Sequence, residues 1–149
     1  AFSSWLSHLR SHGHYLMLES LVFLDLQYID LIGQFLFEAD FEGANLSYAN
    51  LCNSYLDDSF LDGACLAKAD LSNTTLTGAF LRYANLEGAN LVNADLRSVN
   101  LEGAIFTGAD IAGANFERAN LENTNLFEAV NIESANLKNT IYDTNNASH

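Results

Sequence analysis

The sequence of 149 residues contains no proline and only two cysteines. Because no Pro-rich or Gly/Ser-rich linker divides the chain, we expect one folded unit. Two cysteines are too few for a disulfide framework and favour a reducing compartment. No apolar run is long enough to cross a bilayer, and no basic-then-apolar signal peptide stands at the start. We therefore expect a cytoplasmic protein, or an exported or lumenal one if a targeting segment has been removed.

Basic residues are also scarce, since 6 Lys and Arg stand against 19 Asp and Glu, for a formal net charge of −13. So few cations cannot neutralise a phosphate backbone, which argues against direct nucleic-acid binding. The acidic surface permits a basic protein partner or imitation of a nucleic acid. It also fits a protein whose charge serves only its solubility.

The abundant feature is a repeat of five residues. Leu, Phe or Ile stands at every fifth position over 26–126, and after a slip of one residue the pattern continues at Ile132, Leu137 and Tyr142. We call these the centre positions. The partner positions lie two residues earlier and, from Ala39 onward, hold 14 Ala, 3 Thr, 2 Ser and 2 Val. Asn or Asp usually stands between a partner and its centre.

A period of five fits neither a helix, with an apolar period of about 3.6, nor a flat strand, with a period of about 2. A fixed short period instead indicates a solenoid, in which each unit packs only on its neighbours. If the chain turns a corner after each unit, the centre and partner side chains point inward and the other three point outward. Small partner residues are then expected, because a narrow tube has no room for two large side chains per face.

Runs such as residues 84–91, Ala-Asn-Leu-Glu-Gly-Ala-Asn-Leu, closely resemble the motif of the pentapeptide-repeat family. The resemblance covers roughly residues 24–144, in a Leu-rich style similar to cyanobacterial members. It implies an all-β fold, a right-handed quadrilateral β-helix with four pentapeptides per coil. The 24 centre positions then make six coils. At a strand spacing of about 4.8 Å, the rod is about 29 Å long.

We divide the chain into an N-terminal cap over 1–23, the β-helix over 24–144 and a polar tail over 145–149. In the cap, residues 3–12 are expected to form a short helix that covers the first coil, with Ser3 or Ser4 as N-cap. This helix is predicted from apolar residues at helical spacing, namely Phe2, Trp5, Leu6 and Leu9.

Two irregularities are expected within the β-helix. Leu24, Ile29 and Gln34 stand where Ala later dominates, so the first coil is wider or less regular. The extra residue near 129–130 shifts the phase, and we expect a one-residue bulge at a corner, either as an accommodated insertion or as a functional kink.

The sequence does not indicate an enzyme. It contains no Ser-His-Asp arrangement and no Gly-rich phosphate loop. The neighbouring carboxylates of Asp57 and Asp58 are expected on a flat outer wall, without a pocket that could shift a pKa. We therefore expect no catalytic residues and no cofactor.

A metal site is not expected either. His8 and His12 lie four residues apart with His14 nearby, but no Cys or acidic residue completes a set of ligands there. Cys52 and Cys65 are expected to point outward from different faces, so they should not form a disulfide.

Because one coil takes about twenty residues, side chains twenty apart should stack along the rod. An acidic row with one Arg results, at Glu42, Asp62, Arg82, Glu102 and Glu122. Nearby, aromatic side chains occupy positions where this repeat usually has Asn or Asp. Together with nearby carboxylates they form a hypothetical protein-binding surface, which we call the aromatic patch. Its residues are Phe35, Tyr55, Asp57, Asp58, Phe60, Asp62, Phe80 and Tyr83.

Other interpretations of these aromatic residues remain open. They could be ladders that stabilise one coil on the next, or they could pair two copies of the chain through weak homo-association. A further pair, Tyr28 and Tyr48, is expected to stack on another wall.

The leading functional hypothesis is a non-catalytic scaffold that presents a flat acidic and aromatic wall to a protein partner. The alternative is a DNA-mimicking inhibitor or protector of DNA gyrase, because quinolone-resistance proteins of the same family are negatively charged rods. Against it, residues 132–149 show no helical apolar pattern for dimerisation, no long loops interrupt the repeats, and the centre positions are Leu-rich instead of Phe-rich. The chain could also be a structural part of a larger protein.

Overall fold

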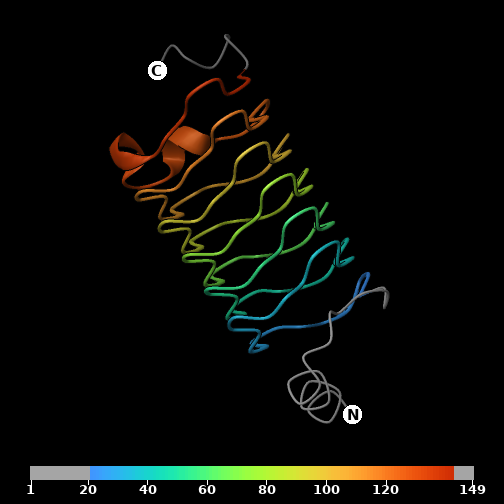
Figure 1. The fold of residues 1–149 in the computed structure, drawn as a ribbon. Coiled ribbons are helices and arrows are strands. Elements are labelled where there is room, and N and C mark those ends of the chain that lie inside the picture. Colours follow the sequence, from blue (N-terminus) through green and yellow to red (C-terminus); the bar gives the residue numbers. More distant parts are fainter. Residues whose placement is uncertain (1–20, 143–149) are drawn as a thin grey trace.

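The computed structural model describes residues 21–142, which form a rod of stacked coils (Figure 1). Parallel single-residue bridges join each coil to the next, and they run from Asp25↔Asn45 to Asp110↔Val130 with a constant offset of twenty residues. A bridge occurs at every fifth residue, so each coil has four walls. In the described part of the chain, the helices are two 3-10 turns, η1 (Leu126–Glu128) and η2 (Ile132–Ser134). The predicted quadrilateral coil is therefore confirmed.

The corners are four-residue turns that begin at each centre position. At one of them the Ala69 N–H donates to the Leu66 carbonyl at 3.0 Å. The third residue of every such turn from 23 to 123 has a positive φ, as at Lys68 with φ 60°. A positive φ at this place is the signature of a type II turn. Backbone hydrogen bonds also join each coil to the next, for example from the Leu66 N–H to the Asn85 carbonyl at 2.7 Å.

The interior contains the two side chains per unit that the repeat predicts. Centre residues such as Leu56, Leu76 and Leu96 are completely buried, and almost all partner residues are buried beside them. Burying a Leu side chain stabilises the fold by about 1.5–3 kcal/mol, so the repeated centre positions provide the main driving force. Two of the polar partners are satisfied from inside, because the Ser54 and Thr74 hydroxyls both donate to the Leu51 carbonyl, at 2.6 and 2.9 Å. The buried Ser59 hydroxyl, by contrast, has no hydrogen-bond partner among the described residues.

The first described coil is less regular inside, as the large partner residues predict. Ile29 is buried, but Leu24 is 39% exposed and Gln34 is half-buried. The coil hydrogen bonds are nevertheless already present at Leu21, whose N–H donates to the Asp40 carbonyl at 2.8 Å. The expected cap helix over 3–12 and the tail over 145–149 lie outside the described residues.

The phase slip is absorbed at Asn131. Up to Val130 the bridges join residues twenty apart, whereas Asn115↔Asn136 and Asn120↔Ile141 join residues 21 apart. Asn131 takes a left-handed conformation (φ 61°, ψ 30°), and its Nδ2 donates to Asp110 Oδ1 at 2.8 Å. The predicted one-residue insertion is thus present at the expected place, and the 3-10 turns η1 and η2 stand on either side of it.

Candidate functional site

Three pairs of aromatic rings stack between neighbouring coils on the outside of the rod. The ring centroids of Phe35 and Tyr55 are 4.9 Å apart with an interplanar angle of 13°. Those of Phe60 and Phe80 are 5.4 Å apart and almost parallel, at 2°. Tyr28 and Tyr48 form the third pair, at 5.0 Å and 13°. Stacked cross-strand aromatic pairs of this kind each stabilise a sheet by about 0.2–1 kcal/mol.

The rings of the aromatic patch are both stacked and open to solvent. Phe35 is 50% exposed and Phe60 is 43% exposed, and their partners in the next coil are exposed to nearly the same degree. Phe35 and Phe60 lie on neighbouring walls, and Phe37 at the corner between them packs on Tyr55 at 6.0 Å. The structure therefore brings the aromatic members of the patch together along one side of the rod.

The three carboxylates of the aromatic patch differ in how they are held. Asp57 Oδ2 accepts a bond from the Thr75 hydroxyl at 2.5 Å, and its Oδ1 accepts one from the Thr77 N–H at 3.2 Å. Asp58 lies against Gly78 in the next coil, where an added methyl group would meet its Oδ1. These two carboxylates therefore contact the coil that follows them.

Asp62 is paired with Arg82 in the next coil. Its Oδ2 accepts bonds from Nε and Nη2 of the guanidinium at 2.9 and 2.6 Å, and its Oδ1 accepts one from the Arg82 backbone N–H at 2.8 Å. The hydrogen bond to Asp62, followed by its negative charge, raises the pKa of Arg82 above its ordinary value. Of the negative charges in the acidic row, that of Asp62 is therefore compensated within the protein.

A second ion pair lies at another corner. Asp95 accepts three bonds from the Arg97 side chain, the shortest at 2.7 Å. These bonds lower the pKa of Asp95, although its partial burial acts in the opposite direction. The two ion pairs compensate only a few of the acidic side chains, so the rod keeps a net negative charge.

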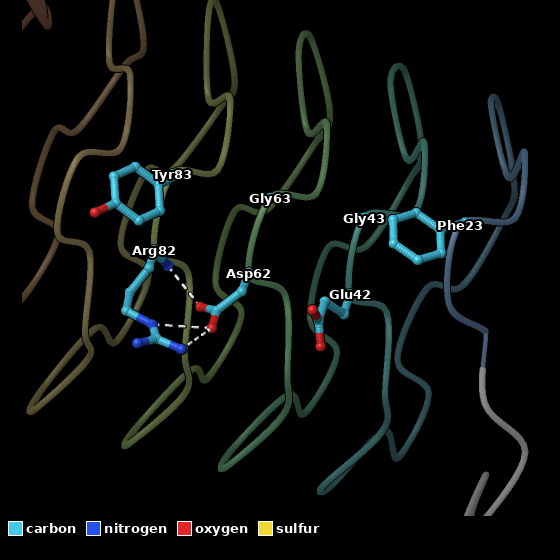
Figure 2. A pocket seen from close by; sticks show the side chains of 7 residues that line it. All are labelled: Phe23, Glu42, Gly43, Asp62, Gly63, Arg82 and Tyr83. Atoms are coloured by element: carbon cyan, nitrogen blue, oxygen red, sulfur yellow. Dashed lines mark hydrogen bonds and ion pairs between the residues drawn. The ribbon is translucent and has the colours of Figure 1, made fainter.

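A hollow of about 400 Å³ opens on the corner that carries Asp62 and Tyr83. Figure 2 shows it from close by, with Phe23 beside Gly43 at one end, Tyr83 at the other, and the Asp62–Arg82 pair along one side. We name it the Gly63 hollow, and its lining residues are Phe23, Glu42, Gly43, Asp62, Gly63, Arg82 and Tyr83.

The shape of the Gly63 hollow follows from which way the corner side chains lean. A Cβ added at Gly43 would meet the Phe23 ring at 2.3 Å, and one added at Gly103 would meet the Tyr83 ring at 2.5 Å. Each ring therefore lies over the glycine of the following coil. At Gly63 an added Cβ would meet nothing within 4 Å, so the space above it is open.

The sequence analysis includes Asp62 and Tyr83 among the candidate site residues but not Phe23, Gly63 or Glu42. Phe23 falls within the expected cap, and Glu42 appears only in the acidic row. The signal was present in the column of corner residues twenty apart, which reads Phe, Gly, Gly, Tyr and Gly from 23 to 103. Two aromatic residues separated by two glycines indicate a gap between rings.

Other features of the described residues bear on the expected chemistry. Cys52 and Cys65 are free, as predicted. Within residues 21–142, no group of three His, Cys, Asp or Glu side chains is placed to hold a metal ion. That part of the chain also has no helix that is long and apolar enough to span a membrane. The three N-terminal histidines lie outside it.

Four-walled coils with type II corners and a Leu and Ala interior define the molecule as a quadrilateral β-helix. Comparison with protein families agrees, because the family model described as "Pentapeptide repeats (8 copies)" matches three stretches of the chain, residues 36–73, 69–108 and 104–141. The chain belongs to the pentapeptide repeat family. No curated protein matched the sequence.

The chain is also similar to solved structures. The chain is 28% identical to the pentapeptide repeat protein Rfr23 from the cyanobacterium Cyanothece 51142, with 97% of each chain covered and a TM-score of 0.51. It is also 28% identical to HetL from the cyanobacterium Nostoc, a protein involved in regulating heterocyst differentiation, with 84% of this chain and 71% of that one covered and a TM-score of 0.47. QnrB1, a plasmid-mediated fluoroquinolone resistance protein, is 20% identical, with 91% and 87% covered and a TM-score of 0.44.

Proposed function

We propose that this protein is a non-catalytic scaffold whose aromatic patch binds a protein partner. The observation that carries the proposal is the pair of neighbouring walls on which Phe35 stacks on Tyr55 and Phe60 stacks on Phe80, all four half-exposed. Exposed aromatic side chains bordered by charged groups are typical of binding hot spots, since they offer a large contact area at low entropic cost.

The columns that contain these rings argue against a purely structural role. Phe80 bridges to Asn100, and Asn100 bridges in the same way to Asn120. On the neighbouring wall the column continues from Tyr55 to Thr75 with the same kind of bridge. Coil pairing in these columns therefore proceeds equally with small polar residues, and the aromatic side chains supply something that the pairing does not require.

The test is a pull-down from lysate of the source cells with the double variant Phe60→Asn/Phe80→Asn. Asn already occupies this column at Asn100, so the variant should fold, and circular dichroism checks that it does. The matched control is Tyr28→Asn/Tyr48→Asn, which removes a stacked and exposed pair outside the aromatic patch.

We expect a partner that wild type and the Tyr variant capture and that the Phe variant loses. A partner retained by both variants, or lost equally from both, contradicts the proposal and returns the rings to the role of structural ladders. If the captured protein is a second copy of this chain, the patch serves homo-association.

The acidic row favours one alternative, a DNA-mimicking inhibitor or protector of DNA gyrase. Glu42, Glu102 and Glu122 lie in one column of the rod, with three coils between the first two and one coil between the last two, and the whole chain has a net charge of −13. A gyrase supercoiling assay separates the two functions. Inhibition at micromolar protein that is lost when the acidic row is neutralised supports mimicry. Unchanged supercoiling contradicts mimicry and leaves the scaffold as the proposed function.

We also propose a cytoplasmic location for the protein, which the two free cysteines support because thiols persist in a reducing compartment. Fractionation of the source cells tests this, and recovery from a lumenal or exported fraction contradicts it.

A further inference from the structure

We propose that the Gly63 hollow binds the guanidinium group of an arginine, presented by a basic segment of the partner protein. This inference rests on the proposed function, since it supplies the chemistry of the partner that the scaffold binds. The hollow opens at the corner that follows the wall of Phe60 and Phe80, and its lining residues Asp62 and Tyr83 belong to the aromatic patch. Variants at Gly63 and Glu42 test the hollow without changing the stacked Phe rings.

The first argument is the unpartnered charge of Glu42. Asp62 pairs with Arg82, the residue of the row one coil later, at 2.6 Å. The residue one coil after Glu42 is Asp62, a like charge that is already paired. Among residues 21–142 the exposed Glu42 carboxylate has no hydrogen-bond or ion-pair partner (Figure 2). An external cation on Glu42 would repeat the Arg82 arrangement one coil earlier.

The second argument is the shape of the space beside Glu42. The backbone at Gly63 forms the floor of the hollow. The space above this floor is open, because a Cβ at Gly63 would meet nothing within 4 Å. The exposed Phe23 ring lies over Gly43 at one end of the hollow, and the exposed Tyr83 ring lies at the other. A flat cation resting on the floor therefore reaches a carboxylate and an aromatic ring together.

The third argument selects arginine among cationic groups. A guanidinium is planar, stacks on aromatic rings and makes two parallel hydrogen bonds to a carboxylate. The lysine ammonium is a compact point charge that gains less from a flat floor and from stacking. The arrangement of Arg82 on Asp62, with both Nε and Nη2 on one carboxylate, shows that this corner suits a guanidinium.

The fourth argument is the length of the hollow. Phe23 and Tyr83 are three coils apart, which is about 14 Å at a strand spacing of about 4.8 Å. An extended peptide rises about 3.3 Å per residue, so about four residues span this distance. The hollow thus fits a short extended segment that runs along the rod with one arginine directed at Glu42.

The test measures the binding of a peptide of alternating Arg and Gly to ¹⁵N-labelled protein by NMR titration. The matched peptides replace Arg by Lys or by the uncharged isostere citrulline. We expect the Arg peptide to shift the amide signals of Gly43 and Gly63. Citrulline should abolish binding, and Lys should weaken it about threefold or more, because stacking and bidentate bonding are lost.

Two pairs of variants locate the site. Gly63→Lys fills the hollow and supplies an internal cation, while Gly108→Lys adds the same charge at another corner with the same open space and nearly the same φ. Lys68 already occupies an equivalent corner with φ 60°, so both variants should fold. Glu42→Gln is compared with Glu87→Gln, which removes an equally exposed charge from another corner.

We expect Gly63→Lys and Glu42→Gln each to weaken the Arg peptide about fivefold or more, and their controls less than about twofold. Equal losses at the two corners would mean diffuse attraction to an acidic rod and would overturn the proposal. Equal affinity of the Arg and Lys peptides would overturn the choice of guanidinium.

The same variants separate this inference from the proposed function. If Gly63→Lys still captures the partner that Phe60→Asn/Phe80→Asn loses, the scaffold function stands and the partner does not use the hollow. If the Arg peptide binds at Gly63 but no partner depends on the Phe rings, the hollow stands and the aromatic patch fails.

Discussion

Residues 21–124 and residues 125–142 form coils of the same kind but with different corners. In the first part, the third residue of every turn has a positive φ, and the bridges keep an offset of twenty. In the second part, η1 and η2 replace two of these turns, and the offset becomes 21 after Asn131. The comparison shows that the register of this solenoid can change by one residue in the last described coil while the bridges between coils are kept.

Burial follows the same division. Centre residues up to Leu126 are almost fully buried, whereas no described residue from 130 to 142 is buried. Ile132, Leu137 and Tyr142 still pack on the core, but from one side. The last coil therefore contributes fewer apolar contacts, and it accepts an extra residue at lower cost than a coil held on both sides.

The largest expected effect on stability comes from placing a one-residue insertion within residues 21–124, the regular part of the rod. Insertion of one Asn after Asp70, which lies in the same column as Val130, forces an offset of 21 on coils that have neighbours on both sides. We expect a loss of about 4 kcal/mol or more in the free energy of unfolding, since several inter-coil bonds and buried side chains lose their partners. Urea denaturation followed by circular dichroism measures it.

Deletion of Asn131 is the matched change in the last coil. It removes the hydrogen bond to Asp110 and the bonds that the Ser134 hydroxyl and N–H donate to the Asn131 carbonyl, but it restores the regular period, in which a turn of the usual kind can form. We therefore expect a change of less than about 1.5 kcal/mol. If the insertion after Asp70 were tolerated as well as this deletion, the contrast between the two parts would be wrong.

A medium effect is expected from removing one buried side chain in each part. Leu76→Ala, in the middle of the rod, should destabilise the protein by about 3 kcal/mol because it leaves a cavity enclosed on all sides. Leu137→Ala should cost about 1 kcal/mol, since Leu137 is only half-buried and its surroundings can relax. Equal shifts of the denaturation midpoint in the two variants would show that the end coil is packed as tightly as the middle.

The smallest effect tests the turns themselves by the same substitution at two equivalent places. Ser98 and Ser134 are both third residues of a turn, but Ser98 has φ 57° while Ser134 lies in η2. Ser98→Gly should stabilise by about 0.5–1 kcal/mol, because glycine adopts a positive φ without strain.

At Ser134 the sign should reverse. Its hydroxyl accepts the Gly113 N–H and donates to the Asn131 carbonyl, both at 3.0 Å, so Ser134→Gly should destabilise by about 1 kcal/mol. Thermal denaturation of the two variants side by side measures the difference, and shifts of the same sign would show that the two turns are alike.

Much of this fold could be predicted from the sequence because the position of a residue within the five-residue period determines whether its side chain points inward or outward. Apolar residues at the centre positions and Ala at the partner positions determine which side chains point inward, and the change of phase before Ile132 located the insertion. The 3-10 turns could not be predicted, because Leu126 opens a unit with the same kind of apolar residue as Leu121.

The candidate site could be predicted only in part. Stacking of Phe35 on Tyr55 and of Phe60 on Phe80 follows from the spacing of twenty residues. The Gly63 hollow depends on the side toward which corner side chains lean, and the sequence does not state that direction. In the structure, Phe23, Lys68 and Tyr83 all lie over the following coil. This common direction leaves the space at Gly63 empty.

Because the offset between coils is a constant twenty residues, the outward side chains of the regular part form straight columns along the rod. The vertical neighbours of an outward residue in the regular part are known from its number alone, and their spacing follows the coil repeat of about 4.8 Å. Since folding depends on the two inward positions of each unit, the other three can be rewritten one column at a time. Such a rod could serve as a molecular ruler on which chemical groups are placed at chosen intervals.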